Sequence, residues 1–420
     1  SRLASENWDA PVIVTTSVQF FESLFAAKSS RCRKLHNIVR SVVVLDEAQL
    51  IPVVFLAPIL ETMQLLVEHY QVSFVISTAT QPALRQRYVG GQLFPGLKNI
   101  KEMMGTDEEV TALYRSLKRC HVQLPADLHM PSSWEEIAEQ LQNYDQVLCV
   151  VSDRKSCREL HSMMPKGTFH LSALMCGQHR SEVIKLIKER LKAKESVRVI
   201  STQLVEAGVD LDFPVVYRAF AGLDSIAQAA GRCNREGKLP DLGRVIVFVA
   251  PRQAPMGILR KAAQTTVNIL SLDYEDPLNH ELFNKYFEEL YWKANSLDKE
   301  KICQLLNPQV NDPQECSIYF RTAAEKFRLI DQSTHGILIP YGEGRQYIEE
   351  LKTIGPNRAL MRKLQRYIVN VYDHEFNQLL KRGAIVEVGP EVFALTSDAE
   401  YSEEVGLMVE PLFDPDKFIL

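Results

Sequence analysis

Short apolar runs alternate with amphipathic stretches from the start of the chain as far as Pro251. The runs begin at seven places: PVIVTT at 11, VVVLD at 42, VSFVIST at 72, QVLCVVS at 146, VRVIST at 197, VVYRAF at 215 and RVIVFVA at 244. Between them, apolar residues recur every three or four positions, as in RSEVIKLIKERLKAKE. Strands that are apolar on both faces and alternate with helices are typical of parallel sheets in α/β domains. The pattern predicts two such domains.

The pattern changes twice along the chain. A polar, loop-like interval from about Gly105 to Ser133 separates the first runs from the later ones, and after Pro251 the sequence becomes helical and charged. Short strand patterns return from about Ser317, around a helix expected near 357–380. The predicted parts are a first parallel-sheet domain over 1–115, a second over 128–252, a helical linker over 253–316 and a small α+β accessory domain over 317–420.

Composition and charge narrow the class of protein. Apolar residues make up 46% and charged residues 24% of the 420 positions, as in ordinary globular proteins, which excludes a disordered or fibrous chain. With a formal net charge of -5, a polyanion must bind through a local basic surface. The chain has neither a run of about 20 apolar residues nor the layout of a signal peptide, so we expect a cytoplasmic protein.

The eight cysteines are scattered along the chain, with no CxxC pair and no histidine at the spacing of a zinc site. We therefore expect reduced, structural thiols.

Two adjacent carboxylates, Asp46 and Glu47, end the second apolar run. In a site that hydrolyses a phosphate, one such acid can hold Mg²⁺ while the other polarises the attacking water. The third run ends in the hydroxyl-rich segment Ser77-Thr78-Ala79-Thr80. Taken alone, each segment also fits a strand that simply ends in a polar loop.

The second domain carries STQ at 201–203, EAGVDLD at 206–212 and QAAGRCNREG at 228–237. We expect Gln228, Arg232 and Arg235 to share one face of a helix and to form an anion clamp. Arginine suits this task because its planar fork stays charged and can stabilise the charge of a transferring phosphoryl group.

The ordered set DEAQ, STAT, STQLVEAGVDLD and QAAGRCNREG resembles motifs II, III, V and VI of superfamily 2 nucleic-acid helicases. That resemblance implies two RecA-like domains with ATP in the cleft between them. The phrase GVDLDFP, the GRCNREG form of the last motif and the appended C-terminal domain look like the CRISPR-associated helicase-nuclease of type I systems. The resemblance covers 11–252 strongly and the residues after 320 loosely.

The resemblance implies a role for each nucleotide motif. Asp46 would coordinate Mg²⁺ with ATP, and Glu47 would activate water. Gly208 and Asp210 would lie at the nucleotide, whereas Gln228, Arg232 and Arg235 would face the γ-phosphate, with Arg235 as the arginine finger.

Other motif residues would couple the domains or touch nucleic acid. Ser77, Thr78 and Thr80 would couple the two domains, together with Gln49, which stands where many members of this group have histidine. Thr15, Thr16 and Gln19 resemble an early motif that contacts the nucleic-acid backbone, and Thr202 would do so from the second domain. Such contacts position a strand without reading its bases.

Three arginines, Arg358, Arg362 and Arg366, recur every four residues in RALMRKLQRYIVNV. If the helix expected there runs from about 358 to 371, they form a narrow basic stripe on it. We expect this stripe to bind nucleic acid, although a merely solvated helix face is the alternative.

Two features of the resembling family are absent from these 420 residues. The chain has no GxxxxGK[ST] loop to cradle phosphates, and none of its ten histidines is followed by aspartate, as the family's metal-dependent nuclease domain would require. We therefore expect both parts on an upstream polypeptide. We also expect the P-loop strand to lie between the strands at 42 and 72, so that its absence would leave two apolar strand edges unpaired.

Three functions fit this sequence. The first is the ATP-dependent, single-strand DNA translocase of a type I CRISPR helicase-nuclease, working with an RNA-guided surveillance complex. The second is a DNA-clamping half-motor that does not hydrolyse ATP, and the third is a general superfamily 2 RNA helicase. The carboxylate pair and the arginine pair favour the first, because a binding module has no chemical need for them.

Overall fold

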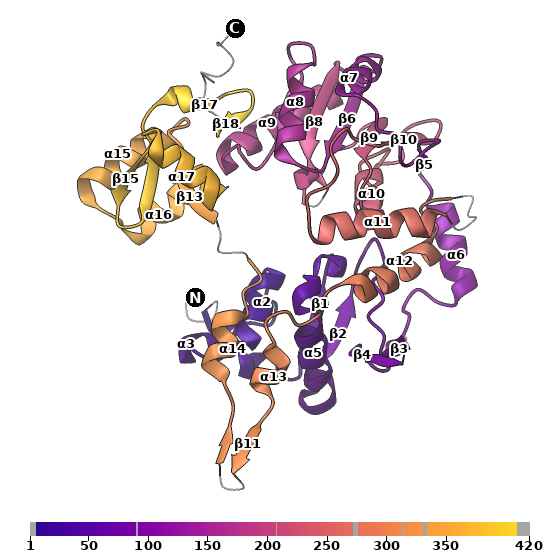
Figure 1. Ribbon diagram of the computed structural model, residues 1–420, viewed down its shortest axis with the longest axis vertical. Helices are drawn as coiled ribbons and strands as arrows, with labels where there is room; N and C mark the ends of the chain where they lie inside the picture. The colour runs from indigo at the N-terminus through magenta and orange to yellow at the C-terminus, as the bar shows by residue number, and fades with distance from the viewer. Residues whose placement is uncertain are drawn as a thin grey trace. The chain divides into compact units, whose positions relative to one another are not determined.

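The computed structural model describes residues 6–89, 91–206, 208–271, 276–312, 315–330 and 334–409 (Figure 1). The chain forms two compact units, each assembled from segments that are far apart in the sequence. The first unit comprises 1–117 and 264–331, and the second comprises 118–263 and 332–420.

The first unit contains a strand–helix–strand element with parallel strands. β1 (Val42–Leu45) pairs with β2 (Ser73–Ile76) in parallel, with Val42 opposite Ser73 and Leu45 opposite Ile76. The connecting helix α5 (Leu56–Tyr70) buries an apolar face that includes Ile59, Leu60 and Met63, none of which is exposed. The element confirms the α/β pattern read from the sequence.

Two expectations for the first unit are wrong. β1 and β2 pair directly with each other, so no further strand lies between them. The run at 11–16 forms no strand either, and Val12 and Val14 are 82% and 95% exposed. Its run of consecutive β-branched apolar residues is strand-like, but a strand also needs a neighbour to satisfy its backbone hydrogen bonds, and no described segment pairs with it.

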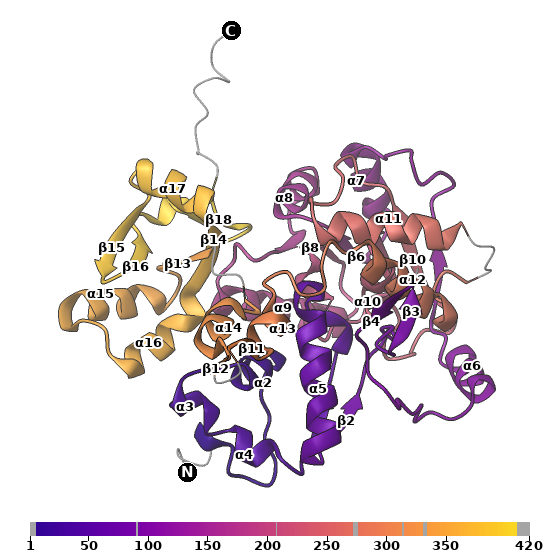
Figure 2. The ribbon, with the colours of Figure 1, turned by 60° about the horizontal axis from the view of Figure 1, so that its bottom comes forward.

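Helices and short hairpins complete the first unit (Figures 1 and 2). The stacking of Phe25 on Phe327, with ring centroids 3.9 Å apart, joins its two sequence segments. The remaining elements are α2 (Ser17–Leu24), α3 (Ser29–Cys32), α4 (Leu35–Ile38), η1 (Ala48–Leu50), η2 (Val53–Phe55), β3 (Arg87–Val89), β4 (Gln92–Phe94), α6 (Asp107–Ser116), α12 (His280–Lys293), α13 (Ile302–Leu306), β11 (Gln309–Asp312), β12 (Glu315–Ser317) and α14 (Phe320–Lys326). Helix α11 (Ile258–Leu270) includes the residues at which the chain passes from the second unit to the first.

A six-stranded parallel sheet forms the centre of the second unit, in the order β5-β10-β9-β6-β8-β7. Its strands are β5 (Cys120–Gln123), β6 (Gln146–Val151), β7 (Phe169–Leu171), β8 (Val197–Thr202), β9 (Val215–Ala219) and β10 (Gly243–Phe248). The helices of this part are α7 (Trp134–Gln142), α8 (Arg154–Ser162), α9 (Gly177–Lys192) and α10 (Leu223–Ala230), with a 3-10 turn η3 (Gln203–Val205) after β8. Residues of α7 and α8, such as Ile137 and Leu160, share one core with the central strands.

The interval from Gly105 to Ser133 is not a simple loop, contrary to expectation. It contains α6, whose first turn carries a capping box between Thr106 and Glu109, and β5, which pairs with β10 at the edge of the large sheet. None of the α6 residues is buried, and Val122 alone is buried in β5. Apolar periodicity could not reveal elements that bury so little.

The C-terminal domain (residues 334–409) has a four-stranded mixed sheet in the order β14-β13-β16-β15, flanked by helices. The elements are β13 (Thr334–Leu338), α15 (Gly344–Ile354), α16 (Arg358–Leu364), η4 (Gln365–Tyr367), β14 (Ile368–Tyr372), α17 (Asp373–Lys381), β15 (Ile385–Gly389), β16 (Val392–Leu395), η5 (Asp398–Glu400), β17 (Tyr401–Ser402) and β18 (Gly406–Leu407). This arrangement confirms the predicted α+β class.

The single helix expected near 357–380 is wrong. The segment is broken by β14, in which Val369 and Val371 are buried on one face and whose backbone pairs antiparallel with β13. The alternating, β-branched sequence IVNVY favours a strand, and pairing with β13 outweighs the helical periodicity on either side.

The C-terminal domain shares a core with the large-sheet part of the second unit. Leu174 and Cys176 belong to the same apolar cluster as Val371 and Leu407. The amide of Leu407 donates to the carbonyl of Leu174 at 2.8 Å, and the hydroxyl of Tyr401 accepts from the amide of Cys176 at 3.0 Å. These contacts fix the domain against the start of α9.

The described residues bear on three expectations, those about membrane-spanning helices, disulfides and metal-ligand groups. None of their helices is long and apolar enough to cross a membrane. Seven cysteines in this part of the chain form no disulfide bond. The same residues contain no group of three or more His, Cys, Asp and Glu side chains that could hold a metal ion.

We predict that Gly406→Ala loosens the C-terminal domain. Gly406 has φ +82°, and an added Cβ would lie 2.4 Å from the carbonyl oxygen of Leu174. Differential scanning calorimetry should show a lower Tm, and limited proteolysis should cut faster between residues 334 and 409.

The matched control is Gly383→Ala. Gly383 also has positive φ, at +70°, but nothing lies within 4 Å of its Cβ position, so this change costs only the backbone term of about 1 kcal/mol. Equal effects of the two substitutions would contradict the importance of the contact with Leu174.

Candidate active site

The acidic pair stands at the carboxyl end of β1. The side chain of Asp46 is exposed, and its Oδ1 accepts a hydrogen bond from the amide of Glu47 at 3.1 Å. Glu47 has φ +54°, in the left-handed region that glutamate rarely occupies. Such strain is often found where a side chain must point in one direction for function.

A chain of polar contacts holds the carboxylate of Glu47. Gln49, only 7% exposed, donates from Nε2 to Glu47 Oε2, and its Oε1 accepts from the hydroxyl of Thr78. The amide of Ser77 donates to the carbonyl of Leu45 at 2.8 Å, which fixes the two loops beside each other. The structure therefore brings the acidic loop (residues 46–49) and the hydroxyl loop (residues 77–80) together.

Thr80 completes the hydroxyl loop from inside. It is fully buried, and its amide donates to the hydroxyl of Thr78 at 3.2 Å. Its own Oγ1 has no hydrogen-bond partner within the described residues. A buried hydroxyl without a partner is costly, so this atom is a candidate for a contact that forms in another state of the protein.

The predicted arginine face is not helical. Helix α10 ends at Ala230, so Gln228 lies in its last turn, whereas Arg232 and Arg235 lie in the turn that follows, here called the arginine loop (residues 231–235). Asn234 adopts φ +48°, and its side chain accepts from the amide of Leu239 and donates to the carbonyl of Arg119. The left-handed residue lies in the arginine loop, four residues after the last residue of α10.

Arg232 is buried, with 7% of its surface exposed. Its Nε donates to the carbonyl of Val205 at 2.8 Å and its Nη2 to the carbonyl of Glu206 at 2.6 Å. The guanidinium therefore ties the arginine loop to the turn after β8. In this conformation it acts as a clamp between two motifs.

Arg235 has a different environment. Its side chain is 44% exposed, and Nε lies 3.2 Å from Oδ1 of Asp210. Asp210 also lies 3.7 Å from Nζ of Lys188. Asp212 accepts from the backbone amides of Arg235 and Glu236 at 2.7 and 3.3 Å, which fixes the loop while leaving the guanidinium accessible.

The remaining nucleotide candidates lie close to these loops in sequence and structure. Gly208 has φ +71° with open space at its Cβ position, so its conformation, and not crowding, favours glycine. Gln228 Nε2 is buried and donates to no acceptor in the described part of the chain. Within the second unit, an unsatisfied amide donor and an accessible guanidinium are groups that can donate hydrogen bonds to phosphate oxygens.

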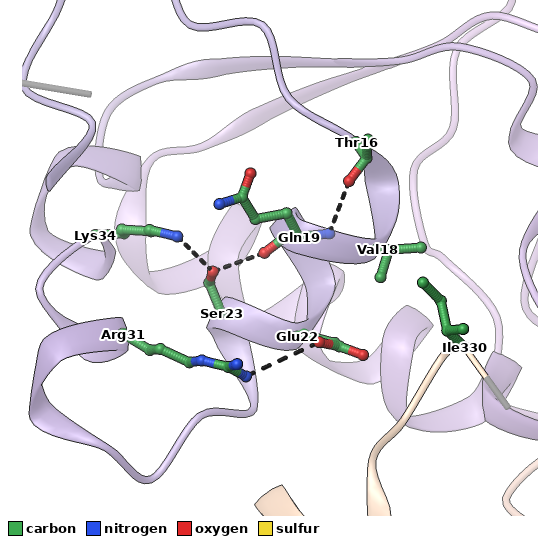
Figure 3. Close-up of a pocket in the computed structure, with 8 residues that line it drawn as sticks. All are labelled: Thr16, Val18, Gln19, Glu22, Ser23, Arg31, Lys34 and Ile330. Atoms are coloured by element: carbon green, nitrogen blue, oxygen red, sulfur yellow. Dashed lines mark hydrogen bonds and ion pairs between the residues drawn. The ribbon is translucent and has the colours of Figure 1, made fainter. Parts of the chain in front are cut away.

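Two of the residues predicted to touch nucleic acid from the first unit, Thr16 and Gln19, border a cavity of about 280 Å³ (Figure 3). Thr16 caps α2 by accepting from the amide of Gln19 at 3.1 Å, and the hydroxyl of Thr15 donates to Gln19 Oε1 at 2.7 Å. Thr16 therefore has a structural role of its own. The matching candidate in the second unit, Thr202, ends β8 and is 9% exposed.

Sequence reasoning missed two cations at this cavity, Arg31 and Lys34. Nζ of Lys34 lies 3.4 Å from the hydroxyl of Ser23 and 4.8 Å from the centre of the Trp8 ring. Burial lowers the pKa of Lys34, and the charge of Arg31 lowers it further. The basic segment SRCRK was the available signal.

The three arginines of the predicted stripe are exposed and form no ion pair with any described residue. Arg358 and Arg362 lie on α16, but Arg366 lies in the 3-10 turn η4. The stripe is therefore shorter than a continuous helix would make it.

Two parallel-sheet parts, one with an acidic loop and a hydroxyl loop at its carboxyl edge and one followed by an arginine loop, are the arrangement expected of two RecA-like folds. Comparison with known proteins narrows this class of fold. Residues 139–238 match the family described as CRISPR-associated nuclease/helicase Cas3, C-terminal. The chain is thus similar to the C-terminal helicase part of Cas3, which confirms the resemblance carried by the motifs.

The relatives and solved structures agree with this family. Cas3 of Haloferax volcanii is 25% identical and covers 72% of this chain, and Cas3 of Methanothermobacter thermautotrophicus is 24% identical and covers 67%. The chain spans 44% and 35% of their lengths, which is less than half. T. fusca Cas3 with AMPPNP has a similar fold, with a TM-score of 0.59 at 16% identity over 95% of this chain and 56% of that one. A chain of a CRISPR RNA-guided surveillance complex, pre-nicking, gives 0.57 at 14% identity over 96% and 61%.

We predict that Asp212→Ala frees the backbone of the arginine loop. A single hydrogen bond to a charged group contributes about 1.5–3 kcal/mol, so losing two should increase local opening by at least roughly tenfold. Hydrogen–deuterium exchange at the amides of Arg235 and Glu236 should accelerate by that factor. Asp210→Ala is the matched control, since Asp210 contacts only the side chain of Arg235 there. Equal acceleration in both variants would contradict the assignment.

Proposed function

We propose that this chain is the ATP-dependent, single-strand DNA translocase module of a type I CRISPR helicase-nuclease. The observation that carries the proposal is the strained, oriented carboxylate of Glu47 next to Asp46, held by Gln49 and Thr78. A clamp that only bound DNA would gain nothing from orienting a carboxylate in this way. The similarity to Cas3 supplies the CRISPR context.

The acidic loop would perform the first part of the chemistry. Asp46, with an exposed carboxylate, would hold Mg²⁺ through its coordination shell, and the bound ion would offset charge on the phosphates. Glu47 would orient and polarise the attacking water. Because Gln49 donates to one oxygen of Glu47, the other oxygen remains available to accept from water.

The arginine loop would act on the charge of the transition state. Arg235 is the proposed finger, because its guanidinium is accessible and, among the described residues, is held only by an exposed pair with Asp210. Arg232 has its donors committed to backbone carbonyls, so we assign it to the position of the loop. Gln228, Gly208 and Asp210 would contribute contacts to the nucleotide.

We propose that a further polypeptide segment supplies the P-loop, because the 420 residues contain no GxxxxGK[ST] motif. The first unit has a surface suited to such a segment. Val42 and Val44 of β1 are 67% and 64% exposed, and Val12 and Val14 are exposed as well. Within the described residues, β1 and β2 pair only with each other. An added strand would cover this apolar surface and complete the sheet. We propose that it belongs to an upstream polypeptide that also carries the nuclease.

The proposed partners are single-stranded DNA and an RNA-guided surveillance complex. Thr15, Thr16 and Gln19 in the first unit and Thr202 in the second would contact phosphates, as would the exposed arginines at 358, 362 and 366. One matching chain was solved within a CRISPR surveillance complex, which supports the second partner.

The test of this function is ATP turnover by the complete protein, comprising this chain and the P-loop segment. Single-stranded DNA should stimulate turnover more than RNA of the same sequence, and the isolated chain should show none above background. Preferential stimulation by RNA would favour a general RNA helicase. Tight DNA binding without turnover would favour the clamp.

We predict that Arg235→Ala lowers kcat for ATP by about 10³ to 10⁵, with a much smaller change in ATP binding. The reason is that a finger acts on charge that develops only in the transition state. Arg232→Ala should reduce both binding and turnover. Arg252→Ala, which removes an arginine paired with Glu159 on the same unit, should leave both unchanged and serves as control. Wild-type turnover in Arg235→Ala would exclude it as the finger.

We predict that replacing Arg358, Arg362 and Arg366 by Gln weakens single-strand binding and flattens its salt dependence. Three lost phosphate contacts on a single strand lower the slope of log K against log salt by about 2. Fluorescence anisotropy at several salt concentrations measures this slope. Changing the exposed Lys155, Lys166 and Lys192 to Gln removes the same charge elsewhere on the second unit. If both triple variants behave alike, the arginines contribute only net charge.

A further inference from the structure

An ion pair that the mechanism above does not use lies behind the arginine loop. Nε of Arg218, on β9, lies 2.8 Å from Oε1 of Glu206, and the two side chains are 0% and 5% exposed. Arg218 also donates to the carbonyl of Ala219 at 2.8 Å and to the hydroxyl of Ser152 at 3.3 Å. Charges are rarely buried so completely, because each loses several kcal/mol of hydration.

The backbone of the same glutamate holds the clamp arginine. The carbonyl oxygen of Glu206 accepts from Nη2 of Arg232, and the preceding carbonyl, of Val205, accepts from its Nε. Arg218 thus forms an ion pair with the side chain of Glu206, and Arg232 donates a hydrogen bond to its main-chain carbonyl. The arginine loop, which starts at Gly231 and presents Arg235, is connected through Arg232 to a strand in the middle of the sheet.

We propose that Glu206 and Arg218 are positioning residues, and that their buried ion pair fixes the turn that holds Arg232 and thereby sets the place of Arg235. The inference rests on the proposed function for its catalytic consequence, but the positioning itself is a property of this chain. Neither side chain needs to touch ATP.

The chemistry of the pair gives this positioning a pH dependence. The pKa of Glu206 is raised to about 7, mainly because the carboxyl group is buried and also because Asp224 is close, whereas Arg218 and Arg232 oppose the shift. The contact to Arg218 lacks the alignment of a hydrogen bond, and Oε1 of Glu206 has no other partner in the described residues, so attraction compensates only part of the lost hydration. The ion pair therefore forms as pH rises through about 7.

The raised pKa of Glu206 determines how the free energy of unfolding changes with pH. The folded chain keeps a proton on Glu206 between pH 4.5, the ordinary pKa, and about 7, whereas the unfolded chain releases it. The free energy of unfolding should therefore fall as pH rises across this window. Glu206→Gln, which cannot ionise, should lack this component.

The decisive experiment separates positioning from stability by using three variants of the complete protein. Arg218→Met leaves a buried carboxyl group without its cation, so Tm should fall. The double variant Glu206→Gln/Arg218→Met buries no charge at this place, and neutral replacement of a buried pair commonly restores stability. Arg218→Lys keeps the charge and is the conservative rescue.

Two readouts are made on each variant. The first is the NMR signal of the Arg232 Nε–H, whose exchange with water is slowed by its hydrogen bond to Val205. The second is steady-state ATP turnover with single-stranded DNA. In the double variant we expect Tm within a few degrees of wild type, at least tenfold faster Nε–H exchange, and at least tenfold lower kcat with little change in KM. Arg218→Lys should recover part of both signals.

The results that would overturn the positioning role differ from those that would refute the proposed function. Unchanged exchange of the Arg232 Nε–H in a folded double variant would overturn the proposal whether or not the protein hydrolyses ATP. Changed exchange with unchanged kcat would confine the pair to a structural role and also overturn it. Absence of turnover in the wild type would refute the proposed function alone. The exchange of the Arg232 Nε–H, which should become slower between pH 6 and 8, would still decide on positioning.

Discussion

Parallel strand pairing places the carboxyl ends of neighbouring strands at the same edge of a sheet, and the placement of the motifs depends on this constraint. In the first unit, the direct pairing of β1 with β2 brings the acidic loop beside the hydroxyl loop, although the loops lie 29 residues apart at their contact between Gln49 and Thr78. In the second unit, β8 and β9 flank β6, and the turn after β8 meets residues of β9. Had β1 and β2 run antiparallel, or had β8 and β9 run in opposite directions, the same sequence motifs would lie at opposite edges of their sheets.

The second unit adds a different requirement, the satisfaction of buried guanidinium groups. Arg218 and Arg232 both lie inside the protein, and both are met mainly by backbone carbonyls and by one glutamate. Because carbonyl oxygens belong to fixed elements, a buried guanidinium that binds several of them determines the relative position of those elements. This accounts for the fixed position of the arginine loop, whose Arg235 side chain remains accessible to a ligand.

Sequence reasoning predicted the parts that follow from long apolar patterns and from motif order. The large sheet, α5 and α9 follow from the alternation of apolar runs with amphipathic stretches. The proximity of Glu47, Gln49 and Thr78 follows from the common edge at which parallel strands end. It failed where local pattern and long-range pairing disagree. The run at 11–16 has a strand pattern but no neighbour among the described residues, β14 has a strand partner inside an apparently helical stretch, and α10 stops at Ala230, before the two arginines of its motif. The pairing of Glu206 with Arg218 could not be read either, because nothing in the sequence shows that these two residues face each other across the sheet.

The shared core between α9 and the C-terminal domain has a consequence for how such chains can evolve. Leu174 and Cys176 lie among residues of the C-terminal domain, and Gly406 packs against the carbonyl of Leu174 so closely that no larger residue fits. A recombination event that exchanged the C-terminal domain alone would leave these apolar residues in water and replace a fitted surface by an unrelated one. The packing therefore ties the large sheet and the C-terminal domain together, so that a larger side chain on one side of their boundary would require a smaller one on the other.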